Sequence, residues 1–215
     1  MCKKRNIYTL SELSLALTAL YNAMNRDFFG GQLEKVVITT KEGSKEHAYG
    51  WITVNKDWTQ GKEKRHEINI SCDYLARPVE EIAATMLHEM VHLYCMQEGI
   101  KDTSRSGYYH NEKFRDAAAA HHLITTQSDK VGWNDSELDE YAQKWITQNC
   151  TFTSVRIRKD TPPPKAEREK KPSSTRKYIC PMCGMSIRAT KEVRILCMDC
   201  NAQMWLNGEP PADDD

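Results

Sequence analysis

Apolar residues recur at helical spacing near the start of the chain, at Leu13, Leu17, Leu20 and Met24. This spacing predicts an amphipathic helix with one buried face, and the segment Thr9–Glu12 has the pattern of a capping box at its start. A second run, Ile82–Met96, is apolar nearly all round, which predicts a helix buried on most sides. Pro78 suits its first turn, and Gly99 can end it.

Three segments before the second helix have the composition of β-strands: Val36–Thr40, Tyr49–Val54 and Glu67–Cys72. After that helix, a loop over Gly99–Tyr109 leads to an alanine-rich helix over Glu112–Leu123. A further helix is expected after Asn134-Asp135-Ser136, because these side chains can cap it. The pattern predicts an α+β fold in which a small antiparallel sheet precedes a helical half.

Composition divides the chain into four predicted parts. They are a folded domain (1–155), a basic flexible linker (156–177), a small second domain (178–206) and an acidic tail (207–215). The whole chain has 30 Lys and Arg against 30 Asp and Glu, but residues 156–200 hold twelve against five. Because no apolar face accompanies this basic stretch, it favours a polyanionic partner such as DNA over a membrane.

The N-terminus superficially resembles a secretory signal, because Lys3-Lys4-Arg5 precedes an apolar run. Glu12 and several hydroxyl side chains interrupt that run, which favours an ordinary folded helix. No segment approaches the roughly 18 apolar residues of a membrane span. We therefore expect a cytoplasmic protein without a membrane partner, and a monomer.

The strongest chemical signal lies inside the buried helix, at His88-Glu89-Met90-Val91-His92. Two histidines four residues apart share one helix face and can hold a single zinc ion. Glu89 lies beside the open metal position, where a carboxylate can take a proton from water. Burying a carboxylate and two imidazoles is costly unless they are paired or bind a metal.

A catalytic zinc site needs a third protein ligand. The metzincin extension is excluded, because Cys95 and Glu98 occupy the places of its glycine and its third histidine. His110 and Glu112 remain, eighteen and twenty positions after His92. The segment around Glu112 resembles the Asn-Glu-x-x-x-Asp signature of thermolysin-like gluzincins, and spacing alone does not choose between the two candidates.

Four of the eight cysteines form two close pairs that are thirteen residues apart: Cys180, Cys183, Cys197 and Cys200. Two such pairs suit a closed tetrahedral zinc site. About thirty residues cannot build an adequate core alone, so zinc would supply the folding energy. This second zinc is expected to be structural.

Basic side chains lie between these two pairs, at Arg188, Lys191 and Arg194. They can contact nucleic-acid phosphates, although a solvated charged surface is an equally good interpretation. Tyr178 and Trp205 can either stack on bases or cover the small core.

Tyr21–Leu33, His88–His92, Gly107–Phe114 and the paired cysteines are four motifs in a fixed order. Together they resemble the SprT-like family, which includes the Spartan proteases. Tyr21–Leu33 resembles the opening signature of the family, and His88–His92 matches its metal helix. Gly107–Phe114 resembles the family segment that carries a third histidine shortly before an aromatic residue. The paired cysteines match the zinc ribbon of many bacterial and phage members.

The resemblance implies a zinc-dependent endopeptidase with one catalytic and one structural zinc. His88, His92 and His110 would bind the catalytic ion, and Glu89 would be the general base. The implied substrates are proteins on DNA, including DNA–protein crosslinks, with DNA recruited by the basic linker and the ribbon. Asn111 stands where the family often has glycine, which keeps Glu112 open as the alternative ligand.

A second hypothesis belongs to a different class of protein. The chain would be a nucleic-acid-binding or regulatory module whose working part is the zinc ribbon and whose histidine site is catalytically quiet. Glu89 argues against this hypothesis, because a binding module does not need a carboxylate between its metal ligands.

Overall fold

The structure is a computed structural model that describes residues 4–42, 48–157 and 175–210. The chain divides into two units, Met1–Thr161 and Pro162–Asp215. Most of the predicted basic linker (156–177) and the last five residues of the predicted acidic tail lie outside the described residues.

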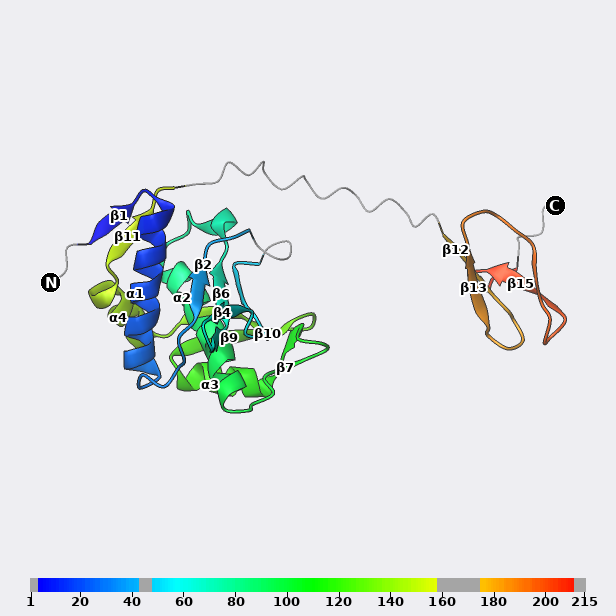
Figure 1. Ribbon diagram of the computed structural model, residues 1–215. Helices are drawn as coiled ribbons and strands as arrows, with labels where there is room; N and C mark the ends of the chain where they lie inside the picture. The colour runs from blue at the N-terminus through cyan, green and yellow to red at the C-terminus, as the bar shows by residue number, and fades with distance from the viewer. Residues whose placement is uncertain (1–3, 43–47, 158–174, 211–215) are drawn as a thin grey trace. The chain divides into compact units, whose positions relative to one another are not determined.

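The helix α2 (Val79–Gln97) is the centre of the first unit (Figure 1). It begins directly after Pro78 and contacts the other three α-helices, α1 (Leu10–Phe28), α3 (Glu112–Ala120) and α4 (Glu140–Asn149). Twelve of its nineteen residues are buried, which confirms the prediction of a helix covered on most sides. Within the described ranges, no helix has both the length and the apolar character needed to cross a membrane.

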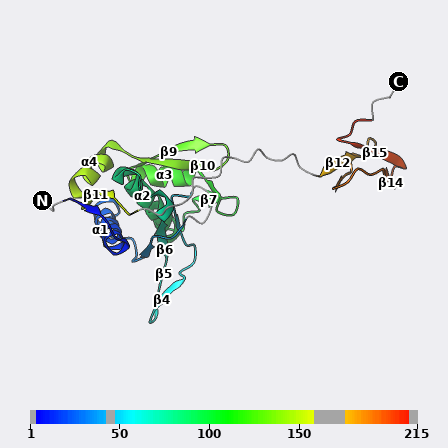
Figure 2. The ribbon, with the colours of Figure 1, turned by 90° about the horizontal axis from the view of Figure 1, so that it is seen from above.

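The first helix, α1, is amphipathic as its sequence predicts. Leu13, Leu17, Leu20 and Met24 are all buried. At its start, the Thr9 hydroxyl accepts a hydrogen bond from the Glu12 amide, and the Glu12 carboxylate accepts one from the Thr9 amide. Just before it, β1 (Arg5–Ile7) pairs in parallel with β11 (Phe152–Val155), so the two ends of this unit lie side by side (Figures 1 and 2).

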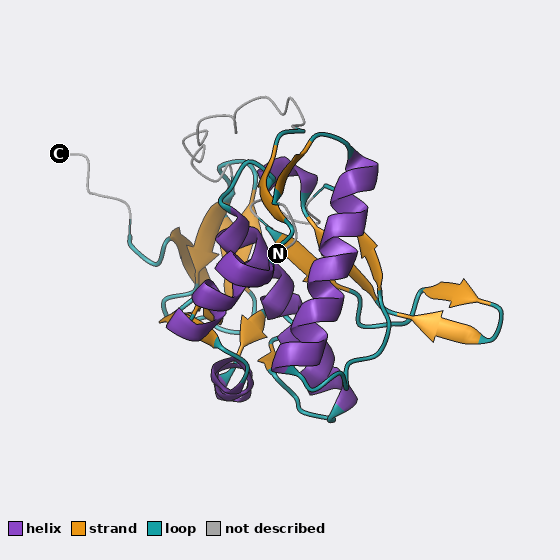
Figure 3. Cartoon of the chain, turned by 90° about the vertical axis from the view of Figure 1, so that its left-hand side faces the viewer, coloured by secondary structure: helices purple, strands orange, loops and turns teal. Residues whose placement is uncertain are grey.

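The three predicted strands form one sheet in the order β2-β6-β3: β2 (Val37–Thr39), β6 (Glu67–Ile70) and β3 (Gly50–Ile52). The expected antiparallel arrangement holds for β3 and β6 but is wrong for β2, which runs parallel to β6. The reason is that β3 and a hairpin intervene before the chain returns to the centre of the sheet. That hairpin, β4 (Trp58–Gln60) and β5 (Glu63–Arg65), projects from the unit (Figures 2 and 3).

A second sheet lies in the part of the chain where a loop and helices were expected. Its strand order is β7-β8-β10-β9, with β7 (Thr103–Ser104), β8 (Tyr109–His110), β10 (Gly132–Leu138) and β9 (Leu123–Ser128). The prediction that Asn134-Asp135-Ser136 caps a helix is wrong, because these residues lie in β10 and pair with β9. The helix α4 begins at Glu140, directly after Asp139, whose carboxylate accepts a hydrogen bond from the Ala142 amide at 2.7 Å.

The second unit is a four-stranded antiparallel sheet in the order β13-β12-β15-β14. The strands are β12 (Arg176–Ile179), β13 (Ser186–Ala189), β14 (Ile195–Cys197) and β15 (Ala202–Leu206). Its buried core consists of only Tyr178, Cys180, Cys197 and Met204 among the described residues. So small a core fits a fold that depends on an additional crosslink.

Candidate metal centres

Three imidazoles converge on one point of the first unit. His88 and His92 come from one face of α2, and His110 comes from the end of β8. Their Nε2 atoms are 3.2 Å apart between His88 and His92, 3.2 Å between His88 and His110, and 3.0 Å between His92 and His110. Ligands about 2.0 to 2.1 Å from a tetrahedral zinc ion are about 3.3 Å from one another, so this triangle has nearly the right size.

The other nitrogen of each ring is held by a neighbouring group. The Nδ1 of His92 lies 2.6 Å from the Asp102 carboxylate, and the Nδ1 of His110 lies 3.4 Å from the Val131 carbonyl oxygen. The Nδ1 of His88 lies 2.8 Å from the Ser136 hydroxyl, which itself donates to the Asn134 carbonyl oxygen. All three partners therefore act as acceptors, and each Nδ1 carries the proton.

In the neutral form of the rings, a proton on each Nδ1 leaves the three Nε2 atoms with lone pairs that face one another. Burial, together with neighbouring histidines, lowers the pKa of His88 well below its usual value and that of His110 to about 4. Neutral imidazoles that face one another in this way are the donor set that a divalent cation satisfies. The residues therefore fit a zinc ion.

Packing beneath the rings fixes their positions. Phe114, at 0% exposure, lies under all three, with ring-centroid distances of 4.7, 4.6 and 4.7 Å to His88, His92 and His110. Behind His110, Gly132 has φ +72°, and a Cβ there would lie 2.0 Å from the His110 carbonyl oxygen. Only glycine allows β10 to approach β8 so closely.

Glu89 lies next to the imidazoles and is 6% exposed. Burial raises the pKa of its carboxyl group to about 7. Strand β3 passes close by, because a Cβ on Gly50 would lie 3.5 Å from Glu89 Oε1. A buried carboxyl group with a pKa near neutrality is suited to both accepting and releasing a proton.

A cleft of about 920 Å³ opens beside this cluster, and His88, Glu89 and Ser136 line it. One wall is the first half of α2, a second is the segment around Gly50 in β3, and a third is β10. The cleft therefore brings together a helix, a sheet edge and one of the candidate metal ligands, His88.

A comparison with models of protein families shows which family the chain belongs to. The model of the SprT-like family matches residues 17–131, which include α2, the three histidines and Glu89. The chain belongs to the SprT-like family. No curated protein and no solved structure matches it.

Within this SprT-like chain, the structure separates the two candidates for a third ligand. His110 is 8% exposed and completes the cluster with His88 and His92. Glu112 lies in the first turn of α3, where its side chain is 79% exposed and faces Arg115 at 3.9 Å. The geometry thus brings His110, and not Glu112, to the candidate zinc site.

The other described histidines and the two tyrosines directly before His110 lie outside the candidate site. His121 ends α3 and binds the Phe28 carbonyl oxygen, while His122 follows the helix and pairs with Asp139. Tyr108 and Tyr109 are not among the residues that line the cleft. His66 is buried and bonds to the Thr53 carbonyl oxygen, and His47 lies outside the described residues.

The sequence did not indicate the groups that orient the candidate ligands. Asp102 lies in the segment predicted as a loop, and Ser136 in the segment predicted as a helix cap. Neither has a fixed spacing from the histidines that it contacts, so no motif could have identified it. Only Phe114 was marked by the sequence, because it is the aromatic residue shortly after His110 in the family-like segment.

The second unit gathers its four cysteines within 4.8 Å of one another. The Sγ atoms of Cys183 and Cys197 are 3.8 Å apart, which matches about 3.8 Å for thiolates 2.3 Å from a tetrahedral ion. Backbone amides, first that of Cys183 and then that of Met182, lower the pKa of Cys180 to about 7. These residues fit a closed structural zinc site.

Proposed function

We propose that this chain is a zinc-dependent endopeptidase that acts on DNA-associated proteins, including proteins crosslinked to DNA. The observation that carries the proposal is the placement of Glu89 beside three converging imidazoles, with Glu89 and His88 lining one open cleft. Membership of the SprT-like family supports the peptidase class. The alternative with Glu112 as ligand is disfavoured by its exposed position.

Glu89 is the general base in this proposal. When bound by His88, His92 and His110, zinc supplies Lewis acidity toward a water molecule and a peptide carbonyl. Glu89 accepts the proton of the attacking water and then delivers it to the leaving amine. Its pKa of about 7 allows both transfers near neutral pH.

The edge of β3 offers a binding surface for an extended substrate. Tyr49 accepts a hydrogen bond from the Ser71 amide, and the Thr53 amide donates to Glu67. By the alternation of an antiparallel pair, the backbone groups of Gly50 point away from β6, on the side without a further described strand. A substrate strand paired there would have its peptide bonds beside Glu89.

The second unit supports the DNA part of the proposal. Lys177 and Arg188 are directly opposite each other on β12 and β13, and Trp205 is opposite Ile179 on β15. Lys177, Arg188 and Trp205 therefore share one sheet face, and both basic side chains are exposed. Such a face combines phosphate contacts with a stacking platform.

Two further basic residues of this unit are exposed, while Tyr178 is buried. Lys191 and Arg194 are exposed in the segment between β13 and β14. Tyr178 is 5% exposed, and its hydroxyl accepts a hydrogen bond from the Val193 amide. Of the two roles open to Tyr178, the structure favours the one in the core.

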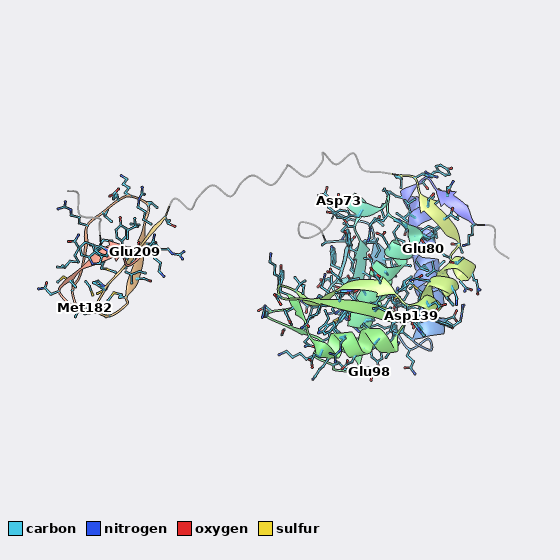
Figure 4. All side chains as sticks on the ribbon, turned by 180° about the vertical axis from the view of Figure 1, so that it is seen from behind. Asp73, Glu80, Glu98, Asp139, Met182 and Glu209 are labelled. Atoms are coloured by element: carbon cyan, nitrogen blue, oxygen red, sulfur yellow. The ribbon has the colours of Figure 1, made fainter. Side chains whose placement is uncertain are left out.

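The decisive experiment compares zinc-loaded wild type with Glu89→Gln on a DNA-binding protein, with and without DNA. The expected result is DNA-dependent cleavage by the wild type and none by the variant, which keeps its zinc. Glu98→Gln, at the other end of α2, is the matched control and should cleave normally. Figure 4 labels Glu80, in the first turn of α2, and Glu98, its C-cap. Cleavage by Glu89→Gln would exclude the proposed mechanism.

The binding-module hypothesis makes the opposite prediction. It requires salt-sensitive DNA binding with no cleavage of any tested protein by the wild type.

The identity of the third zinc ligand has its own test, because His110→Ala should lower the zinc content by one ion while Glu112→Ala should leave it unchanged. Loss of zinc in Glu112→Ala but not in His110→Ala would instead support the gluzincin-type site, with Glu112 as the third ligand.

A further inference from the structure

Arg77 is the only lysine or arginine among the residues that line the cleft beside Glu89. It lies between the short 3-10 helix η1 (Cys72–Tyr74) and the start of α2, and it is half-buried. Arg77 has no role in the zinc chemistry or in the proton transfers proposed above. The contacts of its guanidinium group indicate a different role.

Two of the three guanidinium nitrogens are held by the protein. Nε of Arg77 donates to the Tyr74 carbonyl oxygen at 3.0 Å, and Nη2 donates to the Thr85 hydroxyl on α2 at 3.2 Å. The guanidinium also stacks on the Tyr49 ring, 4.0 Å from the ring centroid. Because a planar group that is bonded at two nitrogens and stacked on one face has a fixed orientation, its third nitrogen is fixed in place as well.

The third nitrogen, Nη1, has no acceptor among the described residues, and Arg77 forms no ion pair with a described carboxylate. Burial lowers the pKa of Arg77, although the charge of Glu81 opposes this effect. Donors of a partly buried cation are costly when they are left unbonded. The two N–H groups of Nη1 are therefore suited to an acceptor that enters the cleft.

Arg77 stands where a substrate strand along β3 would pass. The Tyr49 ring beneath its guanidinium directly precedes β3. A Cβ on Gly50 would be 2.7 Å from Thr85 Cγ2 and 3.5 Å from Glu89 Oε1, so Thr85 and Glu89 border the same residue of the strand edge. A strand that pairs with this edge presents main-chain carbonyl oxygens there.

We propose that Arg77 is a substrate-binding residue whose Nη1 donates a hydrogen bond to a main-chain carbonyl oxygen of the polypeptide strand that lies along β3. The inference rests on the proposed peptidase function and names a residue that positions the substrate. Because every residue of a polypeptide has such a carbonyl group, the contact aligns the strand without selecting its side chains. The contact is the same before and during the reaction, so it lowers KM and leaves kcat nearly unchanged.

The test compares zinc-loaded wild type and Arg77→Gln on a peptide of alternating valine and lysine residues, with an acetyl group and an amide at its ends. Arg77→Gln should raise KM by at least about tenfold, the worth of one hydrogen bond from a charged donor, with kcat nearly unchanged. Loss of a positive charge would by itself lower KM for this cationic peptide, so a higher KM reports the lost contact. Arg77→Lys, which keeps the charge but not the planar fork, should recover only part of the loss.

Thr85→Val separates the substrate contact from the internal bond between Arg77 and α2. It removes the hydroxyl that binds Nη2 and leaves Nη1 in place, so its KM should rise less than that of Arg77→Gln. Arg65→Gln is the matched control and should behave like the wild type, because Arg65 pairs with Glu63 at 2.7 Å and does not line the cleft. An unchanged KM in Arg77→Gln, or an equal rise in Thr85→Val, would overturn the substrate contact and leave the peptidase function intact.

The same peptide with a free C-terminal carboxylate tests the other acceptor that a guanidinium binds. If Arg77→Gln weakens binding of this form only, Arg77 holds a chain end, and the main-chain contact is overturned.

Affinities for the capped peptide in a zinc-loaded Glu89→Gln background test the contact without hydrolysis. Adding Arg77→Gln to this background should weaken binding by at least about tenfold. If this loss is found but the wild type cleaves neither the peptide nor a DNA-bound protein, the contact stands and the peptidase proposal fails. Equal affinities with and without Arg77→Gln would overturn the contact.

Discussion

The Nδ1 atom of His92 lies 2.6 Å from Oδ2 of Asp102, a residue that is 8% exposed. This is the one anionic partner among the three groups that hold the candidate ligands, since His88 and His110 contact a hydroxyl and a carbonyl oxygen. A carboxylate that accepts the Nδ1 proton makes Nε2 a stronger donor toward a metal and fixes the orientation of the ring.

Replacing Asp102 by asparagine should therefore weaken zinc binding at the histidine site by about 10- to 100-fold. The amide can still accept the hydrogen bond but carries no charge. Competition with a chelator measures the effect, and Asp116→Asn serves as control because Asp116 is exposed on α3 and pairs with Arg115. Equal zinc affinity in the two variants would show that Asp102 does not tune the site.

Gly50 allows β3 to lie against α2 beside Glu89. A Cβ there would be 2.7 Å from Thr85 Cγ2 and 2.9 Å from the Asn69 carbonyl oxygen. Gly50→Ala should therefore lower the free energy of unfolding by about 1 to 3 kcal/mol, as overpacking does in other cores. It should also lower cleavage, because β3 must shift relative to Glu89.

A second substitution checks the cause. Gly50→Ala/Thr85→Ser removes the Cγ2 atom and keeps the hydroxyl that binds Arg77. Urea unfolding should show partial recovery, since the contact with Asn69 remains. No recovery would place the strain elsewhere.

The sequence correctly predicted the parts of this fold that depend on residues close together in the chain. The spacing of Leu13 to Met24 and the Thr9–Glu12 capping box specify α1 without help from distant residues. The histidine pair in α2 is likewise readable, because one helix sets its geometry. The prediction for Asn134-Asp135-Ser136 was wrong because the same residues can cap a helix or pair as a strand, and pairing with β9 decides.

In the candidate site, too, local patterns predict some residues, while long-range contacts bring in the others. His110 joins the site through the pairing of β8 with β10, where Gly132 admits the close approach. A register shift between Gly132 and Asp135 accompanies the placement of Ser136 against His88. Such long-range contacts leave no periodic trace in the chain, and the family resemblance alone favoured His110 over Glu112.

Without the zinc ion held by its four cysteines, the second unit should lose its fold. The first unit should stay folded when that ion is lost. Cys197 is 2% exposed and belongs to a core of four described residues. In Cys197→Ser the zinc content should fall from two ions to one, and DNA binding should weaken. The thermal midpoint of the first unit should stay the same, because the two units have separate cores.

The control for this variant is Cys150→Ser in the first unit, where Cys150 is buried and belongs to no metal-binding group among the described residues. It should keep both zinc ions and lose stability only in the first unit. A wild-type zinc content in Cys197→Ser would contradict the structural zinc site.

Glu67 is a buried carboxylate on the face of the first sheet opposite α2. Its oxygens accept hydrogen bonds from the Thr39 hydroxyl at 2.5 Å and the Trp58 indole at 2.7 Å, and Lys41 lies 2.6 Å away. Burial raises its pKa, but these three partners outweigh burial, so the net pKa lies below the ordinary value of 4.5. The charged form therefore stabilises the fold above the unfolded pKa, and this stabilisation is lost as pH falls through the folded pKa.

Glu67→Gln should accordingly cost about 1 to 3 kcal/mol at neutral pH, because Lys41 and Trp58 lose a charged acceptor. The difference in unfolding free energy between wild type and variant should stay constant down to about pH 5 and shrink below 4.5. Urea unfolding across this range measures it, and effects that both proteins share, such as histidine protonation, cancel in the difference. Glu63→Gln, an exposed partner of Arg65 on the projecting hairpin, should show a far smaller difference at every pH. A Glu67→Gln difference that grows toward acid pH would mean that burial, and not the three donors, controls this carboxyl group.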